Sequence, residues 1–189
     1  MQLVQAKEAR QGHQLREKDL NKRVINLRWV FSLNAGGRKQ RMSAFMVVGN
    51  GAGKVGYAIA KAKDTSSAVK KAISKASKSI KKVGMKYGRT PHHDITSKYG
   101  ASVVTIRSAP PGSGIKCSNS IRLYMECLGM KDVVVKSRGS RNPINVIKAI
   151  DKGLRMTSSP REICMRLNIS YAKLLGKESK EALAETTSA

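Results

Sequence analysis

Acidic residues are scarce in this sequence. It contains 12 Asp and Glu against 37 Lys and Arg, a formal net charge of +25 over 189 residues. From residue 20 to residue 93 the only acid is Asp64, and residues 95–125 contain none. A charge excess of this size destabilises a compact chain unless a polyanion neutralises it. Because the excess covers the body of the chain rather than one tail, it predicts nucleic acid as a partner.

Long apolar runs and metal-binding patterns are also missing. No run of 18 or more apolar residues occurs, so we expect no membrane span. The cysteines, Cys117, Cys127 and Cys164, are odd in number and fit no metal template, which favours buried reduced thiols. His92 and His93 are adjacent, and adjacent side chains on an extended chain point to opposite faces. We therefore expect neither a metal nor a cofactor.

The shortage of acids leaves no recognisable catalytic set. Neither a carboxylate pair nor a nucleophile with a base can be assembled, so we expect no catalytic residue and no small-molecule substrate. Residues 51–56 fit the string GxGxxG, but a strand follows them and no acid lies about 20 positions on. A phosphate loop would need Gly at Val48 and Ser or Thr at Val55. The glycines instead predict a tight hairpin turn.

The first half of the chain predicts a β-β-β-α unit at residues 24–84, after an N-terminal arm at residues 1–23. Strands are expected at 24–33, 43–48 and 54–60, and short glycine turns between them predict an antiparallel meander. A helix capped by Asp64 or Ser66 is expected to continue to Val83, with one apolar face and one face of lysines that includes Lys81 and Lys82. Gly84 would end it.

After a linker at residues 85–90, residues 91–168 predict a β-β-α-β-α unit. Its strands lie near 91–96, 102–107 and 132–136, and its helices at 119–128 and 143–156, with a short helix starting at Pro160. Asn142 caps the long helix, and Pro143 occupies its first position. Residues 169–189 form a tail. The fold class is therefore α+β.

The basic residues predict how RNA would be bound. Arg38, Lys39 and Arg41 follow two glycines in an expected loop, and the lysine face of the first helix could lie across a duplex. Aromatic residues make up 4% of the chain and no pair is evident on a strand, which disfavours a base-stacking platform. Backbone amides of the glycine turns are expected to bind phosphate oxygens.

An ordered series of motifs resembles one known family. The strings GGRK (36–39), VVGNG (47–51), GKVG (53–56) and KAKD (61–64) are followed by KYGAS (98–102), PGSG (111–114), GMKD (129–132) and GSRNPINV (139–146). Together they resemble the family of ribosomal protein five of the small subunit. The chain departs from the family at Ala35, where Lys is usual, and at Gln40 and Met42, where aromatics are usual.

The resemblance implies a double-stranded-RNA-binding-like N-terminal domain and a C-terminal domain with a left-handed β-α-β crossover. It implies small-subunit rRNA as a partner, ribosomal proteins four and eight as neighbours, and roles in assembly, in decoding accuracy and where mRNA enters. The cysteines, the histidine pair and the methionine content favour an organellar (mitochondrial matrix) ribosome over a bacterial one. The expected RNA contacts, the last two of which come from the family, are Arg28, Gly36, Gly37, Arg38, Lys39, Arg41, Lys54, Lys61, Lys70, Lys71, Arg107, Arg138 and Arg141.

Two alternatives remain open at this point. The first is a free-standing double-stranded-RNA-binding protein or RNA chaperone, which would bind generic duplexes away from ribosomes. The second is a nucleotide-dependent enzyme, because folds related to the second unit occur among small-molecule kinases. Val48, Val55 and the missing carboxylates speak against the enzyme.

Overall fold

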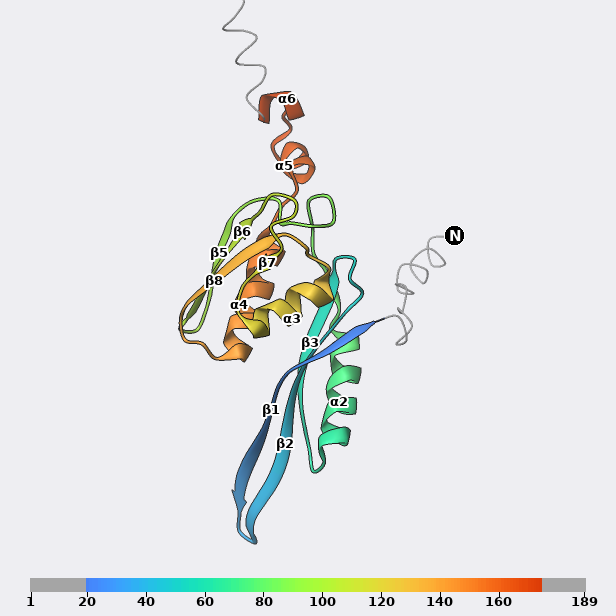
Figure 1. Cartoon of the computed structure of the whole chain (residues 1–189), viewed down its shortest axis with the longest axis vertical. Helices are drawn as coiled ribbons and strands as arrows, with labels where there is room; N and C mark the ends of the chain where they lie inside the picture. Colours follow the sequence, from blue (N-terminus) through green and yellow to red (C-terminus); the bar gives the residue numbers. More distant parts are fainter. Residues whose placement is uncertain (1–19, 175–189) are drawn as a thin grey trace, which may run out of the picture.

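The structure is a computed structural model that describes residues 20–174, in an α+β fold. Most of the expected N-terminal arm and the end of the expected tail lie outside the described residues. In the first unit, β1 (Asn21–Asn34), β2 (Gly37–Gly49), β3 (Lys54–Ala62) and β4 (Lys81–Lys82) form an antiparallel sheet in that order, and α2 (Thr65–Lys78) connects β3 to β4. Figure 1 shows the long β1–β2 hairpin projecting from the body of the molecule. The predicted β-β-β-α order is confirmed.

The first helix is shorter than predicted. It ends at Lys78, and Lys81 and Lys82 lie on β4, paired with Val55 and Lys54, rather than on the helix. The edge of β3 offers free backbone groups, and the chain leaves the helix to pair with them. The hydroxyl of Ser79 donates to the carbonyl of Tyr57 at 3.1 Å, which helps to hold the crossing from helix to strand.

The second unit is a mixed sheet covered by helices on one face. Its strands are β5 (Ile95–Tyr99), β6 (Ser102–Ser108), β7 (Ile115–Lys116) and β8 (Val133–Gly139), in the order β5-β6-β8-β7. Its helices are α3 (Asn119–Leu128), α4 (Pro143–Met156), α5 (Pro160–Leu167) and α6 (Tyr171–Leu174). The two-residue β7 was not predicted. It runs parallel to β8, so β7, α3 and β8 form a β-α-β crossover, whose hand stays a prediction.

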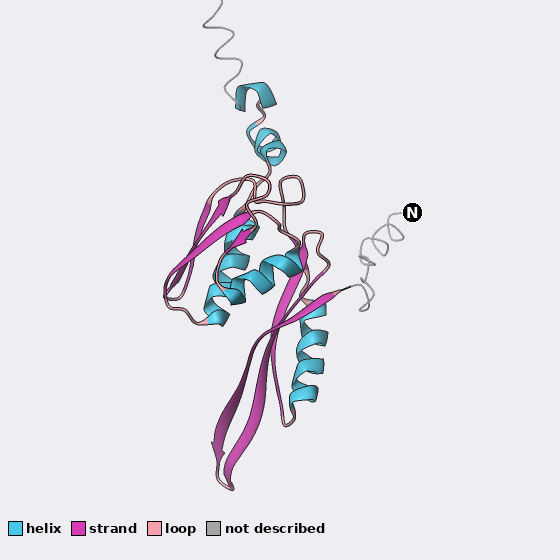
Figure 2. Ribbon diagram, viewed as in Figure 1, coloured by secondary structure: helices cyan, strands magenta, loops and turns pink. Residues whose placement is uncertain are grey.

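The helix ends follow the sequence signals. Asn142 accepts a hydrogen bond from the amide of Ile144, as an N-cap does, and Pro143 follows it. Gly129 ends α3 in the left-handed conformation, with φ of 96°. Ser159 and Glu162 form a capping box at the start of α5. Figure 2 shows α3 and α4 against the second sheet, whereas α5 and α6 extend away from it.

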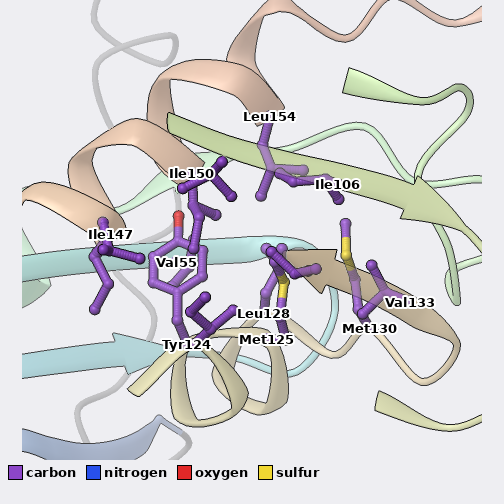
Figure 3. Close-up of a cluster of buried hydrophobic side chains, with 14 of the residues drawn as sticks. Val55, Ile106, Tyr124, Met125, Leu128, Met130, Val133, Ile147, Ile150 and Leu154 are labelled. Atoms are coloured by element: carbon purple, nitrogen blue, oxygen red, sulfur yellow. The ribbon is translucent and has the colours of Figure 1, made fainter. Parts of the chain in front are cut away.

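The two units share one hydrophobic core. On one face of the first sheet, α2 packs its buried alanines, Ala68 and Ala72, against the strands. On the other face, Val47 and Val55 join Tyr124 and the side chains of α4 in the main core. Figure 3 shows Val55 in one cluster with side chains from α3, α4, β6 and β8. Because β2 is covered on both faces, all of its residues from 42 to 49 are buried.

Candidate nucleic-acid interface

The β1–β2 hairpin extends beyond the rest of its sheet. Pairing between β2 and β3 ends at Met42 with Ala62, so residues 30–41 form a two-stranded ribbon (Figure 1). Its turn is only Ala35 and Gly36, and Gly37 follows with φ of 112°. No atom lies within 4 Å of where a side chain would begin at either glycine, so the tip is open to a close approach.

The prediction that Arg38, Lys39 and Arg41 lie in a loop is wrong. These three residues lie on β2 itself, and all three are exposed. A two-residue turn is enough to reverse an antiparallel pair, so pairing continues to the tip, with Asn34 opposite Gly37. Each cation therefore belongs to a strand, which fixes the face of the sheet on which its side chain lies.

The register gathers four predicted RNA contacts on one face. Directly opposed residues of antiparallel strands point the same way. Arg28 is opposite Ser43, which is opposite Lys61, so these three form one row across the sheet. Lys39 and Arg41 lie on the same face nearer the tip, at intervals of about 7 Å along the strand. We call this the basic hairpin face: exposed Arg28, Lys39, Arg41 and Lys61.

The other face of the hairpin carries an apolar stripe, which the sequence analysis missed. We define the apolar hairpin stripe as Leu27, Trp29, Phe31 and Leu33, whose exposed fractions are 42%, 51%, 50% and 85%. The guanidinium of Arg38 lies 4.1 Å from the centroid of the Phe31 ring. The expectation that no aromatic pair shares a strand face is therefore wrong. Alternation of apolar residues at every second position from 27 to 33 is the signal that could have found it.

The remaining candidates in the first unit are not brought to the basic hairpin face. Lys70 and Lys71 are exposed on α2, which covers the Met42 and Ala44 face of the sheet, the opposite side. Lys54 is half-buried at the start of β3, opposite Lys82. The lysines of α2 therefore form a separate basic surface.

A further basic surface lies on the face of the second sheet that the helices leave open. Lys98 of β5 is opposite Val103, which is opposite Arg138 of β8, so both cations stand in one row. Arg107 and Lys136 share this face, which we call the second-sheet basic face: Lys98, Arg107, Lys136 and Arg138. Lys98 and Lys136 are not among the predicted RNA contacts, although the alternation of β8 places Lys136 on the same face as Arg138. Arg141 is exposed just before α4.

The glycine turn between β2 and β3 has no amide left for phosphate. Asn50 donates to the carbonyl of Lys54, Gly51 to that of Cys127 and Gly53 to that of Leu128. The amides of Ala52 and Lys54 both donate to Oδ1 of Asn50. The expectation that this turn binds phosphate is therefore wrong, because its donors attach it to the end of α3. A strand follows the turn, so it is not a dinucleotide loop.

Two acids of the body, Asp132 and Asp151, are turned inward. Asp132 is buried and accepts hydrogen bonds from the amides of Gly112 and Gly114, at 3.0 and 3.1 Å, and from Arg89. The Gly114 amide is the first cause of the lowered pKa of Asp132, and Arg89 adds to it. Asp151 is buried too and pairs with Arg155. These acids neutralise little of the outer surface, which is left basic.

Other kinds of site find no support in residues 20–174. Within that range, no three His, Cys, Asp or Glu side chains are grouped so that they could hold a metal ion. None of the helices described is both long enough and apolar enough to cross a membrane. The basic faces and the apolar hairpin stripe are the candidates for a functional surface in the described part of the chain.

Comparison with known proteins gives the same order of two units. Residues 20–84 match the family model "Ribosomal protein S5, N-terminal domain", and residues 97–166 match "Ribosomal protein S5, C-terminal domain". The chain is 39% identical over 180 residues to "Small ribosomal subunit protein uS5" of Granulibacter bethesdensis, covering 94% of this chain and 95% of the relative. It is 41% identical over 170 residues to the protein of that name from Gluconobacter oxydans, covering 89% of each chain.

Proposed function

Since this chain belongs to the ribosomal protein S5 family, we propose that it binds small-subunit rRNA through the basic hairpin face and the second-sheet basic face. The family makes it a structural constituent of the small ribosomal subunit and not an enzyme. The observation that carries the proposal is the arrangement of Arg28, Lys39, Arg41 and Lys61 on one face of the first sheet. No acid occurs in residues 20–63, so nothing in the sequence of the hairpin neutralises these cations.

The binding needs no chemical step. Cations that neutralise phosphates release condensed counterions, which gives a favourable and salt-sensitive free energy. Because the two units share one core, the two basic faces keep a constant spacing and can hold two RNA segments relative to each other. This constant spacing supports a role in subunit assembly. The projecting hairpin supports roles in decoding accuracy and in mRNA entry. Ribosomal proteins four and eight are the neighbours we propose.

The ribosome type follows from the relatives. Those named above are bacterial, which favours a bacterial ribosome over the organellar one that the sequence composition suggested. The enzyme alternative is set aside by the family. The free-standing RNA-binding protein is the alternative that an experiment must separate from the ribosomal constituent.

Sedimentation of the tagged chain from lysate separates them. Stoichiometric retention with small subunits through a high-salt wash is expected. A protein that is mostly free, or that washes off, would instead be a free-standing RNA-binding protein.

A pair of double variants tests the surface. We expect Lys39→Ala with Arg41→Ala to lower the salt dependence of rRNA binding by the equivalent of about two phosphate contacts. Lys70→Ala with Lys71→Ala removes the same charge from α2 and is the matched control, with a smaller loss of rRNA affinity. An equal loss in both would show that net charge, rather than the basic hairpin face, decides binding.

A further inference from the structure

The apolar hairpin stripe is too large and too exposed to be explained by the fold alone. Trp29 and Phe31 each keep about half of their surface exposed, at 51% and 50%, and Leu33 keeps 85%. They lie on the face of the sheet that α2 covers over β2 and β3, but β1 is the edge strand on the far side of β2. Contiguous exposed apolar surface of this kind marks a binding site.

The ribbon that carries part of the stripe also needs support. Beyond Met42 only two strands remain, and an isolated two-stranded hairpin is marginally stable in water. A partner that covers Phe31 and Leu33 would order this part of the hairpin.

The charges around the stripe decide what that partner is. Arg38 shares the face and lies over Phe31, and Lys39 and Arg41 flank it on the other face. Flat aromatic side chains between cations are the arrangement that binds unpaired nucleotides, because bases stack on the rings while phosphates meet the cations. An apolar protein segment would cover the rings but would desolvate Arg38 without supplying a negative charge.

We propose that the apolar hairpin stripe is a stacking platform for two adjacent unpaired nucleotides of RNA. One base stacks on the indole of Trp29, and the next stacks on the layer formed by Phe31 and the guanidinium of Arg38. The two aromatic side chains are two residues apart on β1, about 7 Å, so each serves one base. The proposal rests on RNA binding by the basic hairpin face and adds the class of RNA that the hairpin recognises.

Trp29 is the only tryptophan in the chain, so its fluorescence reports the platform directly. The full-length protein is titrated with a short single-stranded oligoadenylate and, separately, with inorganic polyphosphate, which has the charge but no bases. Bound fraction is followed independently by filter retention of labelled polymer. Stacking predicts that oligoadenylate quenches Trp29 as it binds, whereas polyphosphate binds without quenching.

The outcomes distinguish this inference from the proposed function. Binding of oligoadenylate without quenching overturns the stacking platform and leaves electrostatic RNA binding intact, with a protein as the partner to seek for the stripe. Failure to retain either polymer or rRNA fragments overturns both proposals. Equal quenching by polyphosphate would mean that Trp29 senses charge rather than bases, and would overturn the platform alone.

A variant tests the second position while Trp29 remains as the reporter. Phe31→Leu keeps an apolar side chain but removes the ring, and we expect about tenfold weaker binding of oligoadenylate. Ser32→Ala, on the opposite face of the same strand, is the matched control with unchanged affinity. Polyphosphate binding is expected to be the same in both. An unchanged oligoadenylate affinity for Phe31→Leu contradicts the proposal.

Discussion

The phenolic hydroxyl of Tyr57, on β3 of the first unit, donates a hydrogen bond to Oδ2 of Asp151, on α4 of the second, at 3.3 Å. Tyr124 of α3 donates to Oδ1 of Asp151 at 3.4 Å, and Arg155 pairs with Oδ2. One buried carboxylate therefore joins three elements across the boundary between the units. Burial, aided by the negative charge of Asp151, raises the pKa of Tyr57 to about 12.

Removing the hydroxyl of Tyr57 should weaken the junction between the units. We expect Tyr57→Phe to lower the free energy of unfolding by about 1–2 kcal/mol, because one hydrogen bond to a charged group is lost. The measurement is equilibrium unfolding in urea. Tyr99→Phe is the control, since the Tyr99 hydroxyl meets Lys148 on the exposed surface and should contribute little. Equal losses in the two variants would contradict the role given to Asp151.

Asp132 should make the free energy of unfolding fall as the pH is lowered into the acid range. Its pKa in the folded protein lies below the ordinary value of 3.8, because the Gly114 amide, Arg89 and the Gly112 amide favour the charged form. The unfolded chain therefore takes up the proton first, so this contribution is complete above the ordinary pKa and is lost as pH falls through the folded one. Asp132→Asn should be less stable at pH 7 and should show a flatter decline in acid.

The measurement for Asp132 is the urea midpoint at a series of pH values. Asp94→Asn is the control. Asp94 and Arg107 are both exposed, with 3.9 Å between Oδ2 of Asp94 and Nε of Arg107, and an exposed pair of this kind contributes little to stability. If Asp132→Asn declines in acid as steeply as the wild type, another group causes the acid sensitivity.

Gly129 should tolerate no side chain. It is left-handed, with φ of 96°, and a Cβ there would overlap the carbonyl of Gly51 in the turn that docks on α3. Gly112 has a similar φ of 88° and open space around it, so Gly112→Ala isolates the conformational cost. We expect Gly129→Ala to be less stable than Gly112→Ala by about 1–3 kcal/mol, the usual cost of overpacking. Equal thermal stability of the two variants would show that the turn can move away.

Cys127 should resist alkylation while the protein is folded. Its side chain is 1% exposed, and burial raises the pKa of its thiol to about 11, so little of the reactive thiolate forms at neutral pH. Iodoacetamide followed by peptide mass spectrometry should find Cys127 unmodified until urea unfolds the chain. The partly exposed Cys164 should react earlier and is the internal control. Early modification of Cys127 would mean that the junction at α3 opens readily.

Much of the candidate site was visible in the sequence, but its division into faces was not. The cations of the hairpin could be named one by one, because they stand in an acid-free stretch. Lys61 shares a face with Arg28 because both are paired with Ser43. This pairing cannot be seen in the sequence alone. An aromatic content of 4% over the whole chain hides Trp29 and Phe31, which the alternation of β1 places on one face.

The sequence by itself determined the order of the longer elements, the family and the need for a polyanion. Periodicity, caps such as Asn142 and glycine turns are local, and net charge is a sum. Only the tertiary structure decided where α2 ends, where the donors of the glycine turn go and which cations share a face. Each of these depends on a partner far along the chain: the edge of β3 for Lys81, the end of α3 for Gly51 and the strand register for Arg28. Pairing over such separations is settled by packing, which local sequence does not encode.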